Sequence, residues 1–270
     1  MTRHILFASL TALLLAVSCT HRGYETFTGY AQGGTYQVKA KLEGVSIPHN
    51  TIAAAIDSLL EGIDFSISGY NRSSILSRRN AGEDISPDRY FSELMELSEK
   101  YKELSGGAFD VCSGPLFDIW GFGFTSDSLP SDDAIQRAMQ DCRDGKVLNF
   151  NAIAQGYSCD VIAGYLHSIG VKDMLVDIGE IYCEGLNPSG KGWTIGVDNP
   201  VDGNNSPGKD LKGIWHSDGS GCGIVTSGNY RKFYIKDGRK YAHTIDPRTG
   251  YPVQHNLLSA TVVAPTAAEA

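Results

Sequence analysis

One histidine stands beside a turn whose side chains suit proton transfer next to an anionic substrate. The stretch from Thr226 to Val253 reads TSGNYRKFYIKDGRKYAHTIDPRTGYPV, and His243 lies two residues before the turn from Ile245 to Gly250. Histidine titrates near neutral pH, so it can accept a proton where Asp, Arg and Thr shape the neighbouring turn. Taken alone, the same residues are equally consistent with a strand end followed by a well-formed turn.

Five further polar clusters share the chain with this histidine. Each is weak evidence alone, because a Gly-Gly pair is usually a bend, a Phe is usually core and an Asn before a helix is usually a cap. The clusters are Gly33-Gly34-Thr35, Ser68-Gly69-Tyr70, Ala108-Phe109-Asp110, Asn149 to Gly156 and Thr226-Ser227-Gly228. A fold must bring them together before they amount to a site.

The spacing of apolar residues predicts the elements that carry the first clusters. Spacings of three and four predict helices over residues 47–63, 87–104 and about 149–168, and a short helix at 132–139 that Ser131 caps. Loose alternation predicts two strands within residues 26–42, separated at Gly33-Gly34. Residues 64–80 are predicted to be a polar loop that exposes Tyr70.

After Gly170 the chain becomes rich in strands. Lys236-Asp237-Gly238 marks a hairpin, and no linker or repeat divides the chain. Short strands are predicted at residues 174–178, 181–183, 193–197, 211–216, 223–226, 231–235 and 257–264. The sequence therefore predicts a single α+β domain with helices packed on a mixed, largely antiparallel sheet.

Composition excludes one class of function. The 270 residues are 41% hydrophobic and 20% charged, which is ordinary for a globular protein with a sizeable core. The formal net charge of -8 and the pI near 5.3 argue against a nucleic-acid surface, because phosphate contacts require clustered Lys and Arg.

The N-terminal segment has the features of an export signal. A short positive region precedes an apolar run from Ile5 to Val17, which is shorter than the roughly 20 residues of a spanning helix. Small residues before Cys19 resemble a bacterial lipobox, so we expect residues 1–18 to be a lipoprotein signal peptide. Lipid on Cys19 would then anchor the protein to a bacterial membrane, facing the periplasm. The alternative is an ordinary secretory signal with an incidental cysteine.

Five cysteines remain when Cys19 is set aside, at positions 112, 142, 159, 183 and 222. Because five is odd, at least one thiol stays free. There is no CxxC pair and no short Cys/His spacing, so neither a zinc site nor a thioredoxin-type motif is supported. An exported protein could hold a disulfide, but buried free cysteines are the preferred prediction.

The order and spacing of the polar clusters resemble the FAD:protein FMN transferases, the ApbE family of exported flavin-attaching enzymes. The resemblance runs from about Gly33 to Ala270. Its most specific parts are GAFD at residues 107–110, NAIAQGYSCD at 151–160 and HTIDPRTGYPV at 243–253. It implies an ApbE-like domain over residues 19–270.

The resemblance implies a reaction. Family members transfer FMN from FAD to a Thr or Ser hydroxyl of a target redox protein through a phosphoester bond, releasing AMP with the help of Mg²⁺. A hard cation held by oxygen ligands suits the diphosphate of FAD. The implied target is a membrane subunit of the NADH:quinone reductase or Rnf type. Two alternatives are an FAD pyrophosphatase that yields FMN and AMP, and a flavin-binding lipoprotein without catalysis.

The resemblance also implies residue roles. His243 is expected to take the proton from the attacking hydroxyl, with Asp246 or the turn backbone orienting it; hydrogen bonding to FAD or the turn is its alternative role. The backbone carbonyl of Ala152 is an expected metal ligand at a helix N-terminus that also favours phosphate. The expected FAD-binding residues are Gly33, Tyr70, Ala108, Phe109, Asp110, Asn149, Gln155, Thr226, Thr244 and Ile245.

Within that set, Tyr70 matches the aromatic residue that packs on the flavin. For Thr226, Thr244 and Ile245 a packing role is about as well supported, because β-branched residues in short strands are usually core.

Several positions depart from the family pattern. Asn149 and Gln155 stand where Asp and Lys are usual, and Gln155 keeps a hydrogen-bond donor while losing the positive charge. One glycine is missing from the turn between Asp177 and Glu180. The sequence ends at Ala270 within APTAAEA, where the family continues to an Asp and a Thr that complete the metal site. We therefore expect either a fragment of a longer gene product or a degenerate member of the family.

Overall fold

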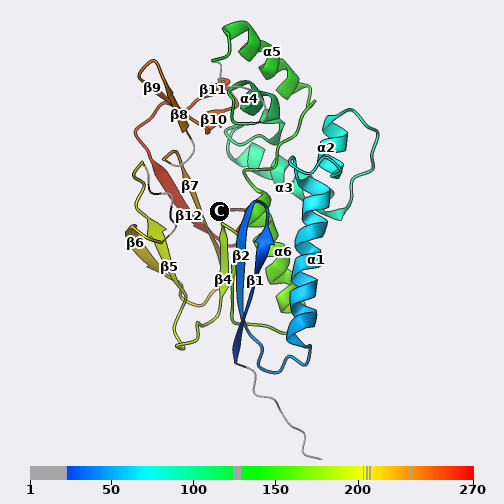
Figure 1. Ribbon diagram of the computed structural model, residues 1–270, viewed down its shortest axis with the longest axis vertical. Helices are drawn as coiled ribbons and strands as arrows, with labels where there is room; N and C mark the ends of the chain where they lie inside the picture. The colour runs from blue at the N-terminus through cyan, green and yellow to red at the C-terminus, as the bar shows by residue number, and fades with distance from the viewer. Residues whose placement is uncertain (1–22, 124–128, 203, 205, 207, 231–232) are drawn as a thin grey trace, which may run out of the picture.

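Six strands form the main sheet, in the order β1-β2-β3-β4-β7-β12, with every neighbouring pair antiparallel (Figure 1). The computed structural model describes residues 23–123, 129–202, 204, 206, 208–230 and 233–270. The strands are β1 Tyr24–Ala31, β2 Gly34–Lys41, β3 Met174–Asp177, β4 Ile181–Glu184, β7 Cys222–Gly228 and β12 Ser259–Ala264. The predicted α+β fold with a largely antiparallel sheet is confirmed, and all of the described strand pairs are antiparallel.

Two long helices cover one face of this sheet (Figure 1). Helix α1 (His49–Ile67) and helix α6 (Ala154–Ser168) bury apolar side chains against the strands. The shared core includes Phe27, Val38, Ile52, Ile56, Ile162, Leu166 and Val176, each at most 2% exposed. Helix α1 begins two residues after its predicted start, whereas α6 begins about five residues after it, because residues 151–153 form a turn before the helix.

The remaining helices lie at one end of the sheet (Figure 1). They are α2 Ile75–Asn80, α3 Arg89–Leu104, α4 Gly114–Ile119 and α5 Asp132–Arg143, with a 3₁₀ turn at Val111–Ser113. The prediction of a loop over residues 64–80 is wrong in part. Helix α1 continues to Ile67, and α2 forms because the Ser74 hydroxyl accepts a hydrogen bond from the Ser77 amide at 2.9 Å.

Three short antiparallel pairs complete the fold. They are β5 Thr194–Asp198 with β6 Leu211–His216, β8 Phe233–Lys236 with β9 Arg239–Ala242, and β10 Ile245–Asp246 with β11 Tyr251–Pro252. The hairpin predicted at Lys236-Asp237-Gly238 is confirmed, with positive φ at Asp237 (52°) and Gly238 (75°), as a tight two-residue turn requires. No helix in the described part of the chain is long and apolar enough to span a membrane.

The segment after β12 is wedged between α6 and β7. The Asp160 carboxylate on α6 accepts hydrogen bonds from the amides of Ala267 and Ala268, both at 2.8 Å. Burial raises the pKa of Asp160 to about 6, although these two hydrogen bonds oppose the shift. A Cβ on Gly156 would lie 2.2 Å from the Ala267 carbonyl oxygen, so only glycine allows this approach.

Two glycines of α6 give a matched test of this wedge. We expect Gly156→Ala to lower the free energy of unfolding by about 1–3 kcal/mol, because the added methyl group overlaps backbone that cannot rotate away. Gly164→Ala lies on the same helix with no atom within 4 Å of the new Cβ, and should raise stability by about 0.5–1 kcal/mol. Urea denaturation of both variants measures the difference; equal effects would contradict the packing described.

Candidate functional site

A cavity of about 340 Å³ lies between α2, α4 and the loop before α6. Tyr70, Asn149 and Asn151 line it, so two of the predicted clusters meet here. The Asn151 side-chain amide donates a hydrogen bond to the Tyr70 hydroxyl at 3.3 Å, and the Tyr70 side chain is 63% exposed. The cavity therefore combines an open aromatic ring with amide groups, which suits a planar ligand that carries polar edges.

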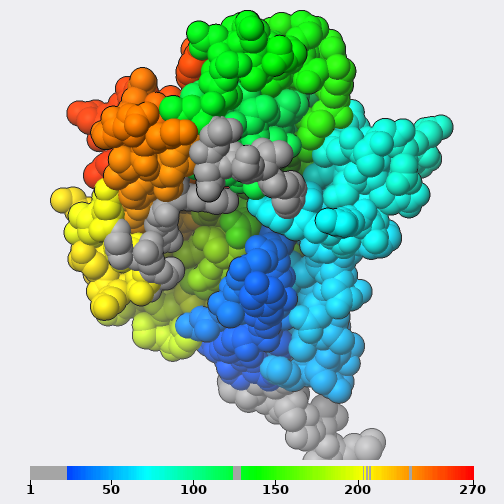
Figure 2. All heavy atoms as spheres, turned by 45° about the horizontal axis from the view of Figure 1, so that its top comes forward, coloured from blue at the N-terminus to red at the C-terminus, as the bar shows by residue number. Residues whose placement is uncertain are grey.

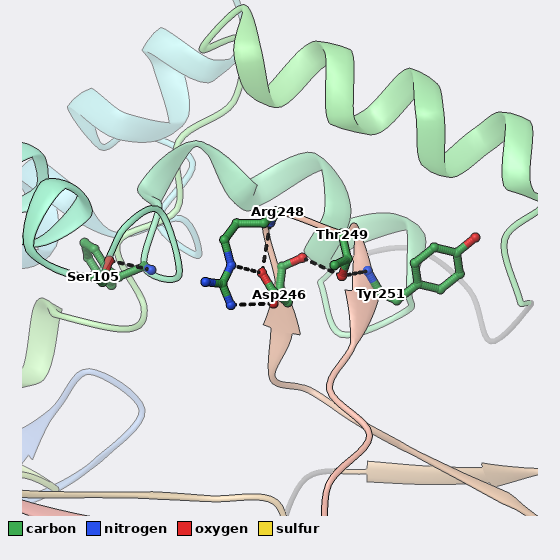
Figure 3. Close-up of polar contacts among 6 residues, drawn as sticks. Ser105, Asp246, Arg248, Thr249 and Tyr251 are labelled. Atoms are coloured by element: carbon green, nitrogen blue, oxygen red, sulfur yellow. Dashed lines mark hydrogen bonds and ion pairs between the residues drawn. The ribbon is translucent and has the colours of Figure 1, made fainter.

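The loop that holds Ala108, Phe109 and Asp110 follows helix α3. Gly107 has φ of 80°, and the Ser105 hydroxyl accepts a hydrogen bond from the Phe109 amide at 3.0 Å (Figure 3). Asp110 forms an ion pair with Lys102 at 2.9 Å and also caps the 3₁₀ turn through the Cys112 amide. The carboxylate of Asp110 is therefore held by the C-terminal end of α3 and by the backbone of its own loop.

This loop contacts the turn that follows His243. The Cγ atom of Arg248 lies 3.8 Å from the position that a Cβ on Gly107 would occupy, and Figure 3 shows Arg248 beside the loop of Ser105. The Asn149 amide in turn donates to the Val111 carbonyl at 2.8 Å. The segments that carry the three motifs at 107–110, 151–160 and 243–253 thus lie next to one another. Asn149, just before the second motif, is hydrogen-bonded to Val111, just after the first, and Arg248 of the third lies beside Gly107.

Asp246 and Arg248 form the rigid part of the turn. The Arg248 guanidinium donates to both Asp246 carboxylate oxygens, at 2.9 and 2.8 Å, and the Arg248 amide adds a third bond at 3.0 Å (Figure 3). These bonds lower the pKa of Asp246, which is therefore ionised. Because both oxygens are bound to Arg248, the role expected for Asp246 in orienting His243 stays a prediction.

His243 directly follows strand β9 and is half-buried. Its ring meets Phe122 edge-on, with centroids 6.3 Å apart, beside the stacked rings of Tyr234 and Tyr241. Next along the chain, the exposed Thr244 donates its hydroxyl proton to the Asn229 side-chain oxygen at 2.6 Å. The His243 ring therefore contacts an aromatic cluster, and the residue that follows it, Thr244, is exposed to solvent.

Ile245 packs against the apolar cluster of α4 and α5, so the structure supports a packing role for it.

The N-terminus of α6 brings together further predicted residues. Ala152 is exposed two residues before the helix, and Gln155 lies in its first turn. The Gln155 side-chain nitrogen is 2.8 Å from the position of a Cβ on Gly179, and the φ of 94° at Gly179 is one that residues with a side chain rarely adopt. The β1–β2 turn that contains the exposed Gly33 also reaches this helix, because the Gln32 amide donates to the Ser158 hydroxyl.

Glu180 is a residue of this region that was not predicted to belong to the site. It follows the Gly179 turn, and its carboxylate accepts a hydrogen bond from the amide of the exposed Thr226 at 3.2 Å. Burial raises the pKa of Glu180 to about 7, and the nearby Asp177 carboxylate adds to the shift. The sequence feature that could have indicated Glu180 is the pair of acidic residues Asp177 and Glu180 on either side of Gly179, at the end of β3.

Among the residues that the structure describes, no three His, Cys, Asp or Glu side chains are grouped so as to hold a metal ion. Ala152 is accessible, but a backbone carbonyl by itself does not make a divalent-ion site, since such ions take several oxygen ligands.

The fold and the joined motifs define a class of protein. Helices α1 and α6 pack on an antiparallel sheet, and the segments that carry the motifs lie next to one another. The ApbE family model matches residues 33–270, and the chain belongs to that family.

Named relatives and solved structures agree with this assignment. The FAD:protein FMN transferase of Vibrio cholerae is 31% identical over 278 residues, covering 94% of this chain and 81% of the relative. The Escherichia coli K12 protein of the same name is 29% identical over 297 residues, covering 97% and 83%.

Two solved structures also superpose well on this fold. The flavin transferase ApbE from Vibrio cholerae has a TM-score of 0.78 at 29% identity, covering 91% of this chain and 83% of that one. The apo flavinyl transferase ApbE from Pseudomonas stutzeri has a TM-score of 0.79 at 31% identity, covering 91% and 81%.

The raised pKa of Glu180 predicts a pH-dependent stability. The folded-state pKa of about 7 lies above the ordinary value of 4.5, so the folded protein binds this proton more tightly than the unfolded chain. The stability that Glu180 contributes is therefore complete below the ordinary pKa and is lost as pH rises through about 7. Gln keeps an acceptor for Thr226 and cannot ionise, so Glu180→Gln should raise the free energy of unfolding by about 1–3 kcal/mol near pH 8.

The same variant should change little at about pH 4, where the wild-type carboxyl is already protonated. Glu96→Gln, at an exposed carboxylate on α3, is the control and should show no such difference between the two pH values. Chemical denaturation at both pH values measures the effect. An equal change for Glu180→Gln at both pH values would contradict the pKa assignment.

Proposed function

We propose that this chain transfers FMN from FAD to a Thr or Ser hydroxyl of a target protein, forming a phosphoester bond and releasing AMP. The observation that carries the proposal is the junction of the loop at Gly107, the turn at Arg248 and the cavity of Tyr70 and Asn149. The relatives that are called FAD:protein FMN transferases support the same reaction.

In the proposed reaction the target hydroxyl oxygen attacks the phosphorus of the FMN half of FAD. A new P–O bond forms to the target, and the P–O bond to the AMP half breaks. His243 takes the proton from the attacking hydroxyl, which raises the nucleophilicity of the oxygen. The half-buried ring beside Phe122 restricts the orientations that the imidazole can adopt.

The remaining residues bind and orient FAD in this proposal. The exposed ring of Tyr70 offers a face for the flavin, and Asn149 and Asn151 offer polar groups in the adjoining cavity. Gln155 at the start of α6 gives a neutral donor near phosphate oxygens, which the helix N-terminus also favours. Gly33, Thr226 and the loop at Ala108–Asp110 form the nearby walls.

Magnesium is part of the proposal by analogy with the chemistry of a diphosphate, with the carbonyl of Ala152 as one ligand. When bound, such a cation would neutralise charge on the phosphates. The described residues by themselves do not form a complete site for it, so every step above is assigned to the residues of the chain.

We also propose where the reaction takes place and on what target. The sequence of the first nineteen residues supports export and a lipid on Cys19, and residues 1–22 lie outside the described part of the structure. An anchored enzyme facing the periplasm would act on a membrane redox subunit, for which the NADH:quinone reductase and Rnf types are the candidates.

His243→Ala tests the proton-acceptor role. We expect flavin transfer to fall by a factor of about 10²–10⁴ while FAD still binds, because the imidazole acts on the attacking hydroxyl. The matched control is His255→Ala, at an exposed histidine outside the joined motifs, which should keep wild-type activity. In-gel flavin fluorescence of a co-expressed target domain measures transfer, and isothermal titration with FAD measures binding. Equal loss of binding and transfer would show that His243 only holds FAD.

The wild-type protein with FAD and Mg²⁺ tests the function itself. A fluorescent target together with AMP release supports the transferase. AMP release without any target points to an FAD pyrophosphatase, and FAD binding that resists EDTA without AMP formation points to a flavin-binding lipoprotein. Either of these two results would overturn the proposal.

A further inference from the structure

Two cysteine thiols face each other across neighbouring strands of the main sheet. Cys183 of β4 and Cys222 of β7 are direct partners in the antiparallel register, and their Sγ atoms are 4.0 Å apart. Directly opposite residues of antiparallel strands have Cα atoms about 4.5–5.5 Å apart. A disulfide spans Cα distances of about 4.4–6.8 Å, so the backbone already meets the requirement for this bond.

Side-chain movement alone can close the remaining gap. An S–S bond is about 2.05 Å long, so the two sulfurs must approach by about 2 Å, which is within the displacement caused by a change of χ1 rotamer. Cys183 is fully buried in a cluster with Trp193, Ile195 and Ile224. Cys222 is only partly buried at the edge of that cluster. The Cys222 thiol is therefore accessible to a reagent from solution, whereas the Cys183 thiol is shielded from solvent.

The other described cysteines are placed differently. Cys159 is completely buried on α6 and contacts the Glu180 carbonyl oxygen at 3.1 Å. Cys142 is buried on α5, and Cys112 lies in the 3₁₀ turn. Of the five described cysteines, all present as thiols, Cys183 and Cys222 are the two whose sulfur atoms are in contact.

We propose that Cys183 and Cys222 are the site of an intramolecular disulfide bond, formed by exchange with a small disulfide such as oxidised glutathione. The Cys222 thiolate attacks one glutathione sulfur and expels a glutathione thiolate, which leaves a mixed disulfide on Cys222. The Cys183 thiol then loses its proton to solvent, attacks Sγ of Cys222 and expels the second glutathione. Two protein thiols are oxidised by two electrons, and one glutathione disulfide is reduced to two thiols.

The order of these steps follows from burial. Burial raises the pKa of Cys183 to about 12, and it also raises the pKa of the less buried Cys222. Because the thiolate is the nucleophile, the more accessible Cys222 reacts first, and exchange should be faster at higher pH. Export, as proposed above, places the pair in a compartment where disulfides persist.

The bond would fasten β4 to β7 next to the site. Glu180 immediately precedes β4, and its carboxylate binds the Thr226 amide further along β7. A covalent link at Cys183 and Cys222 therefore acts on the same strand pair that carries this contact. It removes conformational freedom from the unfolded chain and should stabilise the folded domain.

The experiment compares the purified protein kept reduced with the same protein incubated with oxidised glutathione. Free thiols are then alkylated under denaturing conditions, and the digest is analysed by mass spectrometry without reduction. We expect a peptide that links Cys183 to Cys222, with two fewer alkylated thiols per chain. Cys222→Ser and Cys183→Ala should each abolish the linked peptide, while Cys142→Ala, at a buried thiol of another cluster, should retain it.

A second measurement uses thermal unfolding. The oxidised wild-type protein should unfold at a midpoint roughly 5 °C or more above the reduced form, and Cys222→Ser should show no such rise. Retention of all thiols after incubation, a stable glutathione adduct on Cys222, or a link between other cysteines would each overturn the proposal. The wild-type digest is decisive even where a variant folds poorly.

Discussion

The position of α6 on the main sheet depends on residues 266–268, which pack between α6 and β7. Ala267 lies against two glycines at once, because a Cβ on either Gly156 or Gly223 would come within 2.2 Å of its backbone. The two oxygens of Asp160 bind the amides of Ala267 and Ala268. Helix α6 is thus fixed against the sheet at its N-terminal end. That end carries Gln155, and β7 carries Thr226, so this contact helps to fix the positions of two residues that we propose to bind FAD.

The space-filling view shows how several outer elements lie on one face of the molecule (Figure 2). The β1–β2 hairpin and α1 lie side by side below the helices of residues 75–143, and the β8–β9 pair borders those helices (Figure 2). Several side chains of these segments are held by partners close in sequence. The Arg248 guanidinium donates hydrogen bonds to both Asp246 oxygens, and the Ser105 hydroxyl accepts one from the Phe109 amide. Lys102 forms an ion pair with Asp110. The carboxylates of Asp110 and Asp246 are therefore each paired with a positive side chain close in sequence, Lys102 and Arg248.

Much of this could be predicted from the sequence, because the governing signals are local. Helices α1, α3 and α6 follow from apolar periodicity, and the β8–β9 hairpin follows from Asp237-Gly238. Helix α2 was missed because it is short and depends on the cap at Ser74. The contact of Gly107 with Arg248 involves residues that are distant in sequence, so no local pattern predicts it; only the combined order of the motifs pointed to a shared site.

The same dependence on residues distant in sequence explains why no local pattern predicted a role for Glu180. Its raised pKa arises from burial, which depends on residues distant in the sequence: Cys159 of α6 contacts its carbonyl oxygen, and the amide of Thr226 in β7 binds its carboxylate and opposes the shift. The Asp177 carboxylate adds to the shift, and it lies at the end of β3, before the Gly179 turn that leads to Glu180. Because two acidic side chains are drawn together by one turn and partly buried, the charged form of Glu180 is disfavoured. Glu180 therefore tends to hold a proton near pH 7.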